Sequence, residues 1–249
     1  IGAPLSVVLA SRSGPRPLNI DNEDALDELV ATSRPRAIAY LVNDRTSQVE
    51  GEITRLRSAL AAARRHRVER FLFASSAAVY GDAHRFRIAE RDSLMGTSDY
   101  AAAKIRSEEE VAAFRHDEGL SSVALRIFNV FGPGCDASLV NRLAFGPAPT
   151  LRLSNRFVRD YVHVDEVARA FIIAAERRDV TGAVNIARGI PVDNLTLASS
   201  VPIDRYQAVE GGPDSYSVAD VTKARTRLGW SPSIDPVDLL RHGIPSTSC

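Results

Sequence analysis

The chain has 249 residues, of which 45% are hydrophobic and 25% charged, and its 31 basic and 31 acidic side chains give a formal net charge of zero. These values are typical of a globular protein with one large α/β domain, or a main domain with a small appendage. The neutral balance gives no indication of nucleic acid or an anionic membrane as a main partner. Cys135 and Cys249 are too few for a disulfide framework or a zinc site, so we expect no metal. Since no apolar run has membrane-spanning length, we expect a reducing, cytoplasmic setting.

Residues 7–10 are the first segment with the character of a strand, and Ile1 and Gly2 stand shortly before them. A parallel crossover needs a dozen or more residues, usually including a helix, and only residues 3–6 are available here. We therefore expect the N-terminal strand and helix of an α/β fold to be incomplete in this sequence.

Farther along the chain, apolar runs alternate with helical patterns, which is typical of repeated βαβ units. The apolar runs predict strands at residues 37–42, 71–74, 122–128 and 183–186, and the helical patterns lie at residues 52–65, 100–114, 163–176 and 220–228. Because the strands lack polar alternation, they fit a parallel sheet covered on both faces. The last helix is expected to end at Gly229, ahead of Pro232.

Tyr100 and Lys104 lie four residues apart in the predicted helix 100–114, which places the phenol and the ammonium on one face about one turn apart. A fixed cation beside a phenol favours the phenolate, so such a tyrosine can exchange a proton with a sugar or steroid oxygen near neutral pH. Lysine occurs only at Lys104 and Lys223, whereas every other basic side chain of the Lys/Arg class is arginine. The same spacing also occurs on ordinary helix surfaces, so the pair depends on its neighbours for its meaning.

Five ordered segments carry a resemblance to a known family. They are S-S-A-A-V-Y-G at 75–81, Y-A-A-A-K at 100–104, R-I-F-N-V-F-G-P-G at 126–134, R-D-Y-V-H-V-D at 159–165 and D-V-T-K-A-R-T-R-L-G-W at 220–230. Together they resemble the extended short-chain dehydrogenase/reductases, specifically the NAD-dependent epimerase/dehydratase family that acts on nucleotide sugars. The resemblance runs from about Asn19 to Trp230, most of the chain.

The resemblance implies an α/β fold with a Rossmann-type, doubly wound parallel sheet and a small C-terminal substrate-binding lobe. The dinucleotide-binding domain would comprise residues 1–131, and residues 132–249 would form mainly the small lobe, with segments that return to the main domain. It also implies a catalytic triad of Ser76, Tyr100 and Lys104.

The substrate-binding residues implied by the resemblance are Ser76, Tyr80, Phe128, Asn129 and Arg159. Four of them have a plainer alternative: Ser76 as a strand-end hydroxyl satisfied by backbone, Arg159 as an ion-pair partner of Asp160 or Asp165, and Tyr80 and Phe128 as core aromatics. His163 is expected to be a packed or capping histidine, and Glu90 and Asp92 to lie on a solvated loop.

The cofactor-binding residues implied by the resemblance are Gly2, Arg12, Asn19, Ile20, Leu41, Tyr100 and Lys104. Gly2 is what remains of the glycine-rich loop that cradles the pyrophosphate. Arg12 lies near the end of the second strand, where a cation suits the 2′-phosphate of NADP. The cofactor is therefore expected to be NAD or NADP, with NADP favoured for a reductase.

The residues after Ser76 narrow the reaction. Dehydratases of the family place an Asp-Glu pair there to expel water, whereas this chain has Ala77 and Ala78, which cannot do acid-base work. A second phosphate-binding arginine of the 4-epimerases falls on Glu210. We expect hydride transfer at a ring carbon, C4, of a nucleotide sugar by a keto-sugar reductase, with an NAD-dependent 4-epimerase as the alternative. A non-catalytic cofactor-binding regulator is a third possibility, and the family resemblance favours a homodimer.

Overall fold

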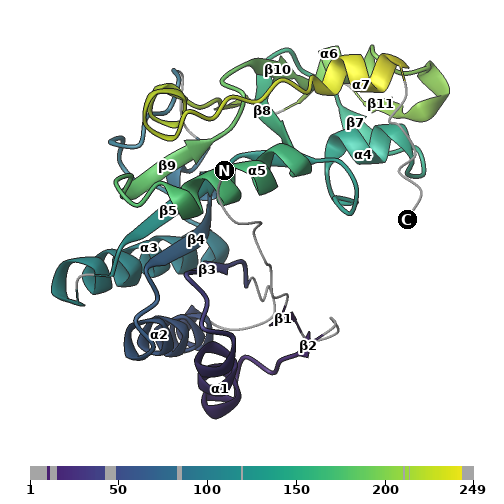
Figure 1. Ribbon diagram of the computed structural model, residues 1–249. Coiled ribbons are helices and arrows are strands. Elements are labelled where there is room, and N and C mark those ends of the chain that lie inside the picture. Colours follow the sequence, from purple (N-terminus) through teal and green to yellow (C-terminus); the bar gives the residue numbers. More distant parts are fainter. Residues whose placement is uncertain are drawn as a thin grey trace.

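A parallel four-stranded sheet forms the centre of the molecule (Figure 1). The computed structural model describes residues 10–11, 16–42, 49–82, 86–118, 120–209, 211–212 and 214–242. The central strands, in spatial order, are β3 (Ala37–Tyr40), β4 (Arg70–Ser76), β5 (Ser122–Ile127) and β9 (Gly182–Ile186). All four predicted strands are therefore confirmed in position. Their carboxyl ends meet at one edge, where open α/β sheets bind ligands.

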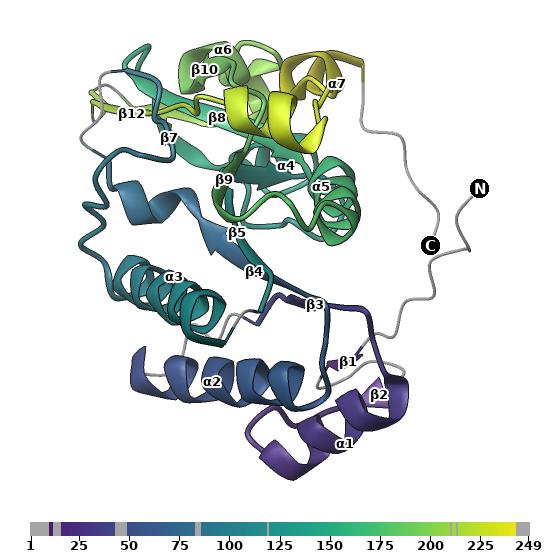
Figure 2. The ribbon, with the colours of Figure 1, turned by 60° about the vertical axis from the view of Figure 1, so that its left-hand side comes forward.

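Helices cover both faces of this sheet (Figure 2). On one face lie α1 (Glu23–Ser33), α2 (Val49–Arg65) and α3 (Asp99–Glu118), and on the other lies α5 (Val164–Glu176). The predicted helices at 52–65, 100–114 and 163–176 are confirmed. Helix α1 was not expected, because its buried stripe is only Leu26 and Val30. Asn22 starts it by accepting a hydrogen bond from the Ala25 N–H.

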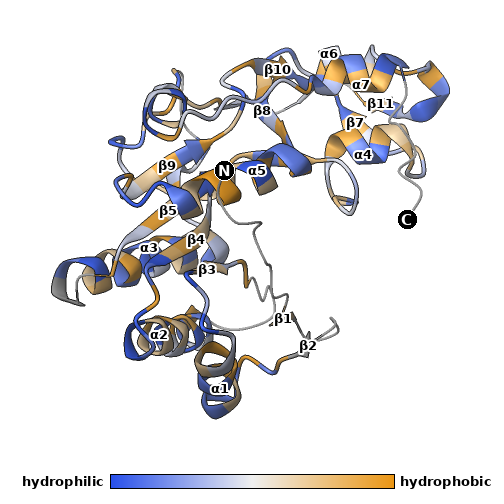
Figure 3. Cartoon of the chain, in the orientation of Figure 1, coloured by the Kyte–Doolittle hydropathy of each residue, from blue (hydrophilic) through white to orange (hydrophobic). Residues whose placement is uncertain are grey.

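Two apolar clusters lie on the two sides of the sheet. The first joins α1 and α2 to β3 and β4 through residues such as Leu56, Leu60 and Phe71. The second joins α5 to β5 and β9 and includes Trp230, which is fully buried. Figure 3 shows both hydrophobic and hydrophilic colours along α5 and α7, as expected for helices with one buried face. This double coverage confirms the doubly wound α/β fold.

A smaller lobe follows the third central strand. Its mixed sheet contains β6 (Asn129–Phe131), β8 (Phe157–His163), β10 (Pro191–Asp193) and β12 (Ser215–Ser217). Around it lie α4 (Leu139–Ala144), α6 (Asn194–Ala198), η2 (Ile203–Arg205), α7 (Pro236–His242) and the parallel pair of β7 (Thr150–Arg152) with β11 (Gln207–Val209). Between the parts of this lobe, α5 and β9 return to the central sheet.

The two ends of the chain contain one predicted helix, at 220–228, and one predicted strand, at 7–10. The predicted helix at 220–228 is confirmed over residues 222–228, where Ala224–Leu228 form the π-helix η3, and Gly229 ends it in the left-handed conformation with φ 69°. At the other end, β1 (Ala10–Ser11) pairs in parallel with β2 (Arg16–Pro17). Of the strand predicted at 7–10, only Ala10 belongs to the described residues, and the expected N-terminal incompleteness lies outside them. No helix in the described ranges has the length and apolar character needed to span a bilayer.

Candidate functional site

Ser76 ends β4 and begins the 3₁₀ helix η1 (Ala77–Tyr80). Its side chain is half-buried, and its Oγ accepts a hydrogen bond from the Ala78 N–H at 3.2 Å. The plainer alternative, a hydroxyl satisfied by backbone, is thus present in the structure. This backbone contact uses the Ser76 hydroxyl only as an acceptor, because no described residue accepts its proton. The hydroxyl therefore remains able to donate to a ligand oxygen.

Gly96 joins this turn to the start of α3. The N–H groups of Met95 and Gly96 both donate to the Val79 carbonyl at 3.0 Å. A Cβ atom on Gly96 would lie 2.4 Å from the Ala78 carbonyl oxygen and 2.4 Å from the Ala101 Cβ. Only glycine permits this approach, which brings the turn after Ser76 against the first turn of α3.

Tyr100 and Lys104 occupy the first turns of α3, as the spacing predicted. The Tyr100 side chain is 37% exposed, and no described residue makes a hydrogen bond with its hydroxyl. Lys104 is 2% exposed, and its Nζ lies 5.7 Å from the centroid of the Tyr100 ring and 5.0 Å from that of Phe73. A buried ammonium therefore lies under an exposed phenol, a cation–π arrangement that also keeps a positive charge near the hydroxyl.

Glu52 of α2 provides the counter-ion of Lys104. Its Oε1 lies 3.4 Å from Lys104 Nζ, and the Val42 carbonyl oxygen is 3.5 Å from the same nitrogen. Burial lowers the pKa of Lys104, and the charge and hydrogen bond of the Glu52 carboxylate oppose that lowering. The sequence analysis did not identify Glu52, although a charged residue on the apolar stripe with Leu56 and Leu60 was a visible signal.

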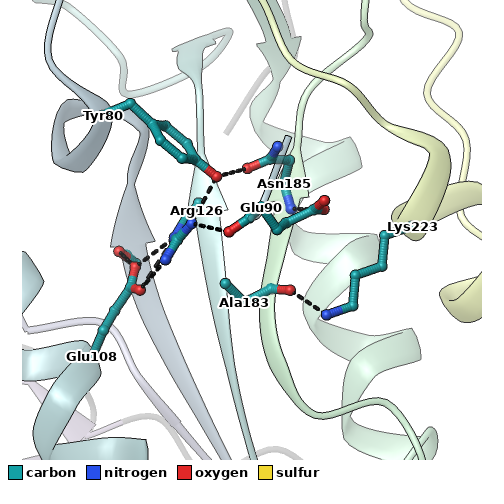
Figure 4. A network of polar contacts seen from close by, with 8 residues as sticks. Tyr80, Glu90, Glu108, Arg126, Ala183, Asn185 and Lys223 are labelled. Atoms are coloured by element: carbon teal, nitrogen blue, oxygen red, sulfur yellow. Dashed lines mark hydrogen bonds and ion pairs between the residues drawn. The ribbon is translucent and has the colours of Figure 1, made fainter. Parts of the chain in front are cut away.

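A second buried ion pair lies one turn farther along α3 (Figure 4). Glu108 receives N–H groups of Arg126 at 2.6 to 3.1 Å and the Ser75 hydroxyl at 2.5 Å. Arg126 also donates to the Tyr80 hydroxyl at 2.8 Å, and Tyr80 donates to the Asn185 Oδ1 at 2.7 Å. This network ties α3 to the strand that carries Ser76. The i, i+4, i+8 spacing of Tyr100, Lys104 and Glu108 was its only sequence signal.

Tyr80 and Phe128 fit their plainer alternative, core aromatics, because both are buried in one apolar cluster. Tyr80 is 0% exposed, with its hydroxyl held in the network just described.

Glu90 was wrongly expected to be solvated. It is half-buried, its carboxylate accepts the Asn185 N–H at 2.9 Å, and its carbonyl accepts from Arg126 at 3.0 Å. Asp92 stays on a loop, where it accepts the Ala89 N–H.

Asn129 and Arg159 lie on the neighbouring strands β6 and β8. The Asn129 side chain donates to the Asp160 carbonyl at 3.1 Å. The Arg159 guanidinium stacks on Phe157 at 4.0 Å and has a long contact of 3.4 Å to Asp82. Its predicted alternative partners are wrong, since neither Asp160 nor Asp165 pairs with it. The guanidinium also donates to the Val158 carbonyl at 3.0 Å. Desolvation lowers the pKa of Arg159, and the charge of Asp82 opposes that lowering.

Asp160 is fully buried and fixes the lobe instead. Its carboxylate accepts the N–H groups of Arg188, Gly189 and Ala219 at 2.9, 2.8 and 3.2 Å. Burial raises the pKa of Asp160 to about 6, while the three backbone N–H groups act in the opposite direction. Asp165 instead lies 3.6 Å from His163, which caps α5 as expected.

The residues expected to bind a cofactor are only partly described. Leu41 follows β3 at the carboxyl edge of the sheet and is 61% exposed, as suits a residue that a ligand covers. Asn19 forms a turn in which its Oδ1 accepts the Asp21 N–H, and Ile20 packs against the first apolar cluster. Gly2 and Arg12 lie outside the described residues. Leu41, Tyr100 and Lys104 as cofactor-binding residues therefore stay a prediction.

A cavity of about 540 Å³ lies away from these residues, at the outer side of β9. Glu90, Asp220 and Lys223 are among its lining residues, and none of the predicted triad is. Lys223 is held there by the Ala183 carbonyl at 2.6 Å. We place the site at Tyr100 because its exposed hydroxyl and buried cation supply chemistry that this shallow, mixed-charge cavity lacks.

Comparison with known proteins shows which family the chain resembles. The family model described as the NAD dependent epimerase/dehydratase family matches residues 8–187. A UDP-glucose 4-epimerase of Lacticaseibacillus casei is 30% identical over 202 residues, which cover 69% of this chain and 61% of that protein. A dTDP-glucose 4,6-dehydratase of Actinoplanes sp. is 30% identical over 193 residues, which cover 72% of this chain and 60% of that protein. The chain thus spans about three fifths of the length of these two relatives.

Solved structures share the fold. The UDP-glucose 4-epimerase of Thermotoga maritima with UDP-glucose has a TM-score of 0.75 and 25% identity, covering 90% of this chain and 81% of that one. The dTDP-glucose 4,6-dehydratase of Bacillus anthracis in complex with NAD has a TM-score of 0.80 at 17% identity, covering 91% of this chain and 77% of that one.

Proposed function

The chain belongs to the NAD-dependent epimerase/dehydratase family, and on that premise we propose that it is an NAD-dependent 4-epimerase of a nucleotide-activated sugar. One observation carries the proposal: an exposed phenol, Tyr100, lies over the buried ammonium of Lys104. Relatives named as UDP-glucose 4-epimerases favour this alternative over the keto-sugar reductase that the sequence analysis placed first.

In the proposed reaction Tyr100 takes the proton of the sugar C4 hydroxyl and later returns it. Lys104 places a positive charge beside the Tyr100 ring, and Ser76 donates its free hydroxyl proton to the reacting oxygen. When bound, the nicotinamide would supply the hydride acceptor and donor. Return of the hydride would leave no net redox change, and its delivery to the opposite face of the sugar ring would invert C4.

Asn129 and Arg159 are proposed to hold the nucleotide. Arg159 suits a phosphate because its guanidinium is buried against Phe157 and has only a 3.4 Å contact with Asp82 to balance its charge. We propose a uridine diphosphate sugar as the first substrate to test, since several relatives carry that name.

Loss of water from the sugar is a poor fit, although one relative is a dehydratase. The two residues after Ser76, Ala77 and Ala78, begin η1 and have methyl side chains. Neither can protonate a leaving hydroxyl, so the proposed chemistry stops at hydride and proton exchange.

We propose NAD rather than NADP as the cofactor. Solved structures of the same fold hold NAD, and Arg12, the basis for NADP, lies outside the described residues. The expected homodimer stays a prediction, which light scattering of the purified protein tests.

The deciding experiment follows UDP-glucose with catalytic NAD for the appearance of its C4 epimer. Tyr100→Phe is expected to lower kcat by about 10²–10⁴-fold without changing NAD binding, while Tyr206→Phe in the small lobe keeps wild-type turnover. Near-normal activity of Tyr100→Phe would overturn the mechanism. Stoichiometric use of NADH or NADPH with a keto-sugar nucleotide would favour the reductase, and absence of turnover with any sugar nucleotide would favour the regulator.

A further inference from the structure

We propose that Glu52 is a positioning residue that keeps Lys104 charged while leaving its N–H groups able to turn toward a bound ligand. The inference rests on the proposed function only for its kinetic consequence, since the charge of Lys104 can be measured without turnover. Glu52 would act on the reaction through Lys104 and would touch neither sugar nor cofactor.

Lys104 and Glu52 are both buried. The side chains of Lys104 and Glu52 are 2% and 5% exposed, so water compensates neither charge. An ammonium without a counter-ion in such a place releases its proton readily, because desolvation disfavours the charged form. A neutral Lys104 would no longer place a positive charge beside the Tyr100 ring. The carboxylate of Glu52 is therefore what makes a buried lysine usable here.

Among the described neighbours of Lys104, Glu52 is the group that compensates its charge. Tyr100 on α3 and Phe73 on β4 face the ammonium with aromatic rings. Arg55, one turn beyond Glu52 on α2, pairs with Asp21 at 2.9 Å. The buried Tyr40 of β3 has its pKa raised by burial and then by Glu52, so it stays neutral at physiological pH. The charged and titratable groups described around this pair are Tyr40, Asp21, Arg55 and Tyr100.

The Lys104 ammonium makes no short hydrogen bond with Glu52 or Val42. Lys104 Nζ is 3.4 Å from Glu52 Oε1 and 3.5 Å from the Val42 oxygen, both at the outer limit for hydrogen bonds. A charge-assisted hydrogen bond that held the ammonium firmly would measure about 2.7–2.9 Å. The carboxylate thus compensates the charge at a distance where rotation of the ammonium toward a ligand hydroxyl breaks no short contact.

The chain contains a matched control two residues away. Glu50 lies on the same helix and also pairs across to α3, with Arg106, but both of these side chains are exposed. Glu50→Gln therefore removes one carboxylate and one α2–α3 ion pair, as Glu52→Gln does, without touching a buried charge.

The experiment uses the fact that Lys104 and Lys223 are the only lysines. With ¹³C-labelled lysine the protein gives two Cε signals, whose pH titrations report each amine separately. Glu52→Gln is expected to move the Lys104 midpoint to lower pH and to leave that of Lys223 in place, whereas Glu50→Gln moves neither. An unchanged Lys104 midpoint in Glu52→Gln overturns the proposal. If that variant does not fold, Glu52→Asp replaces it, with a smaller shift in the same direction expected and no shift contradicting us.

Turnover gives the independent readout. Glu52→Gln is expected to lose on the order of tenfold in kcat at alkaline pH and to regain it as the pH falls, with KM little changed. Glu52→Asp should restore part of the alkaline activity. A uniform loss at every pH would mean a structural role and would contradict the proposal. Failure of the proposed function looks different, because Tyr100→Phe would then be active while the Lys104 titration still shifted.

Discussion

Helix α3 carries two buried ion pairs one turn apart, and they are built differently. Glu108 and Arg126 share several hydrogen bonds of 2.6 to 3.1 Å, and the Ser75 hydroxyl adds another. Lys104 and Glu52 make a single contact of 3.4 Å. The first pair fixes the helix against the sheet, and the second holds its cation by no short hydrogen bond. A ligand-binding site needs both kinds of ion pair. The tight pair gives the rigid support on which catalytic geometry depends, and the loose pair leaves a cation that can turn toward a ligand.

The largest effect is expected where the tight pair is broken. Arg126→Met leaves Glu108 buried without a counter-ion and removes a donor to Tyr80. The free energy of unfolding should fall by about 3–5 kcal/mol, measured by urea denaturation. Arg106→Met, which breaks an exposed pair on the same helix, should change it far less. Equal losses in the two variants would remove the distinction between these pairs.

Asp160 is a third buried carboxyl group, and backbone N–H groups hold it rather than a paired cation. Burial raises the pKa of Asp160 from 3.8 to about 6, so between these values the folded protein binds a proton that the unfolded chain has lost. This contribution to stability is complete below pH 4 and is lost as the pH rises through 6, a change of about 3 kcal/mol.

Urea unfolding of wild type and Asp160→Asn at pH 4 and pH 7 measures this contribution. The difference in free energy of unfolding, wild type minus variant, should fall by about 3 kcal/mol between the two pH values. A difference independent of pH would show that the carboxylate is ionised across this range, as in a paired site.

The smallest effect on stability is expected at the loose pair. Replacing both partners, with Lys104→Met and Glu52→Gln together, leaves no unpaired charge and relieves the desolvation of two ions. The free energy of unfolding should stay within about 1 kcal/mol of wild type, while turnover is lost. A loss of stability as large as that of Arg126→Met would mean that both pairs serve the fold.

The sequence was sufficient for the strands and for the helix that presents Tyr100 and Lys104, because both follow from local apolar patterns and spacing. It was insufficient for Tyr80, whose hydroxyl partners lie 46 and 105 residues away. Arg159 shows the same limit, since its neighbours in sequence suggested ion pairs that the strand geometry does not form. Such partners depend on the tertiary fold rather than on any local pattern.

Secondary structure failed where local signals were weak or misleading. The short stripe of α1 has only Leu26 and Val30 against many charges. The segment ending at Gly229 has the periodicity and stop signal of an α-helix, yet it widens into a π-helix packed against the sheet through Ala224 and Leu228. Packing decides its helical pitch, and packing is not visible in the spacing alone.

The spacing between the turn after Ser76 and helix α3 is set by the absence of a side chain at Gly96. At Gly96 any Cβ would lie 2.4 Å from both the Ala78 carbonyl oxygen and the Ala101 Cβ, so backbone atoms define the separation there. Natural variation should therefore be suppressed at this loop position even though Gly96 takes no part in the reaction. A redesign that needs more room between the turn after Ser76 and α3 would have to lengthen the loop around residues 95–98 first.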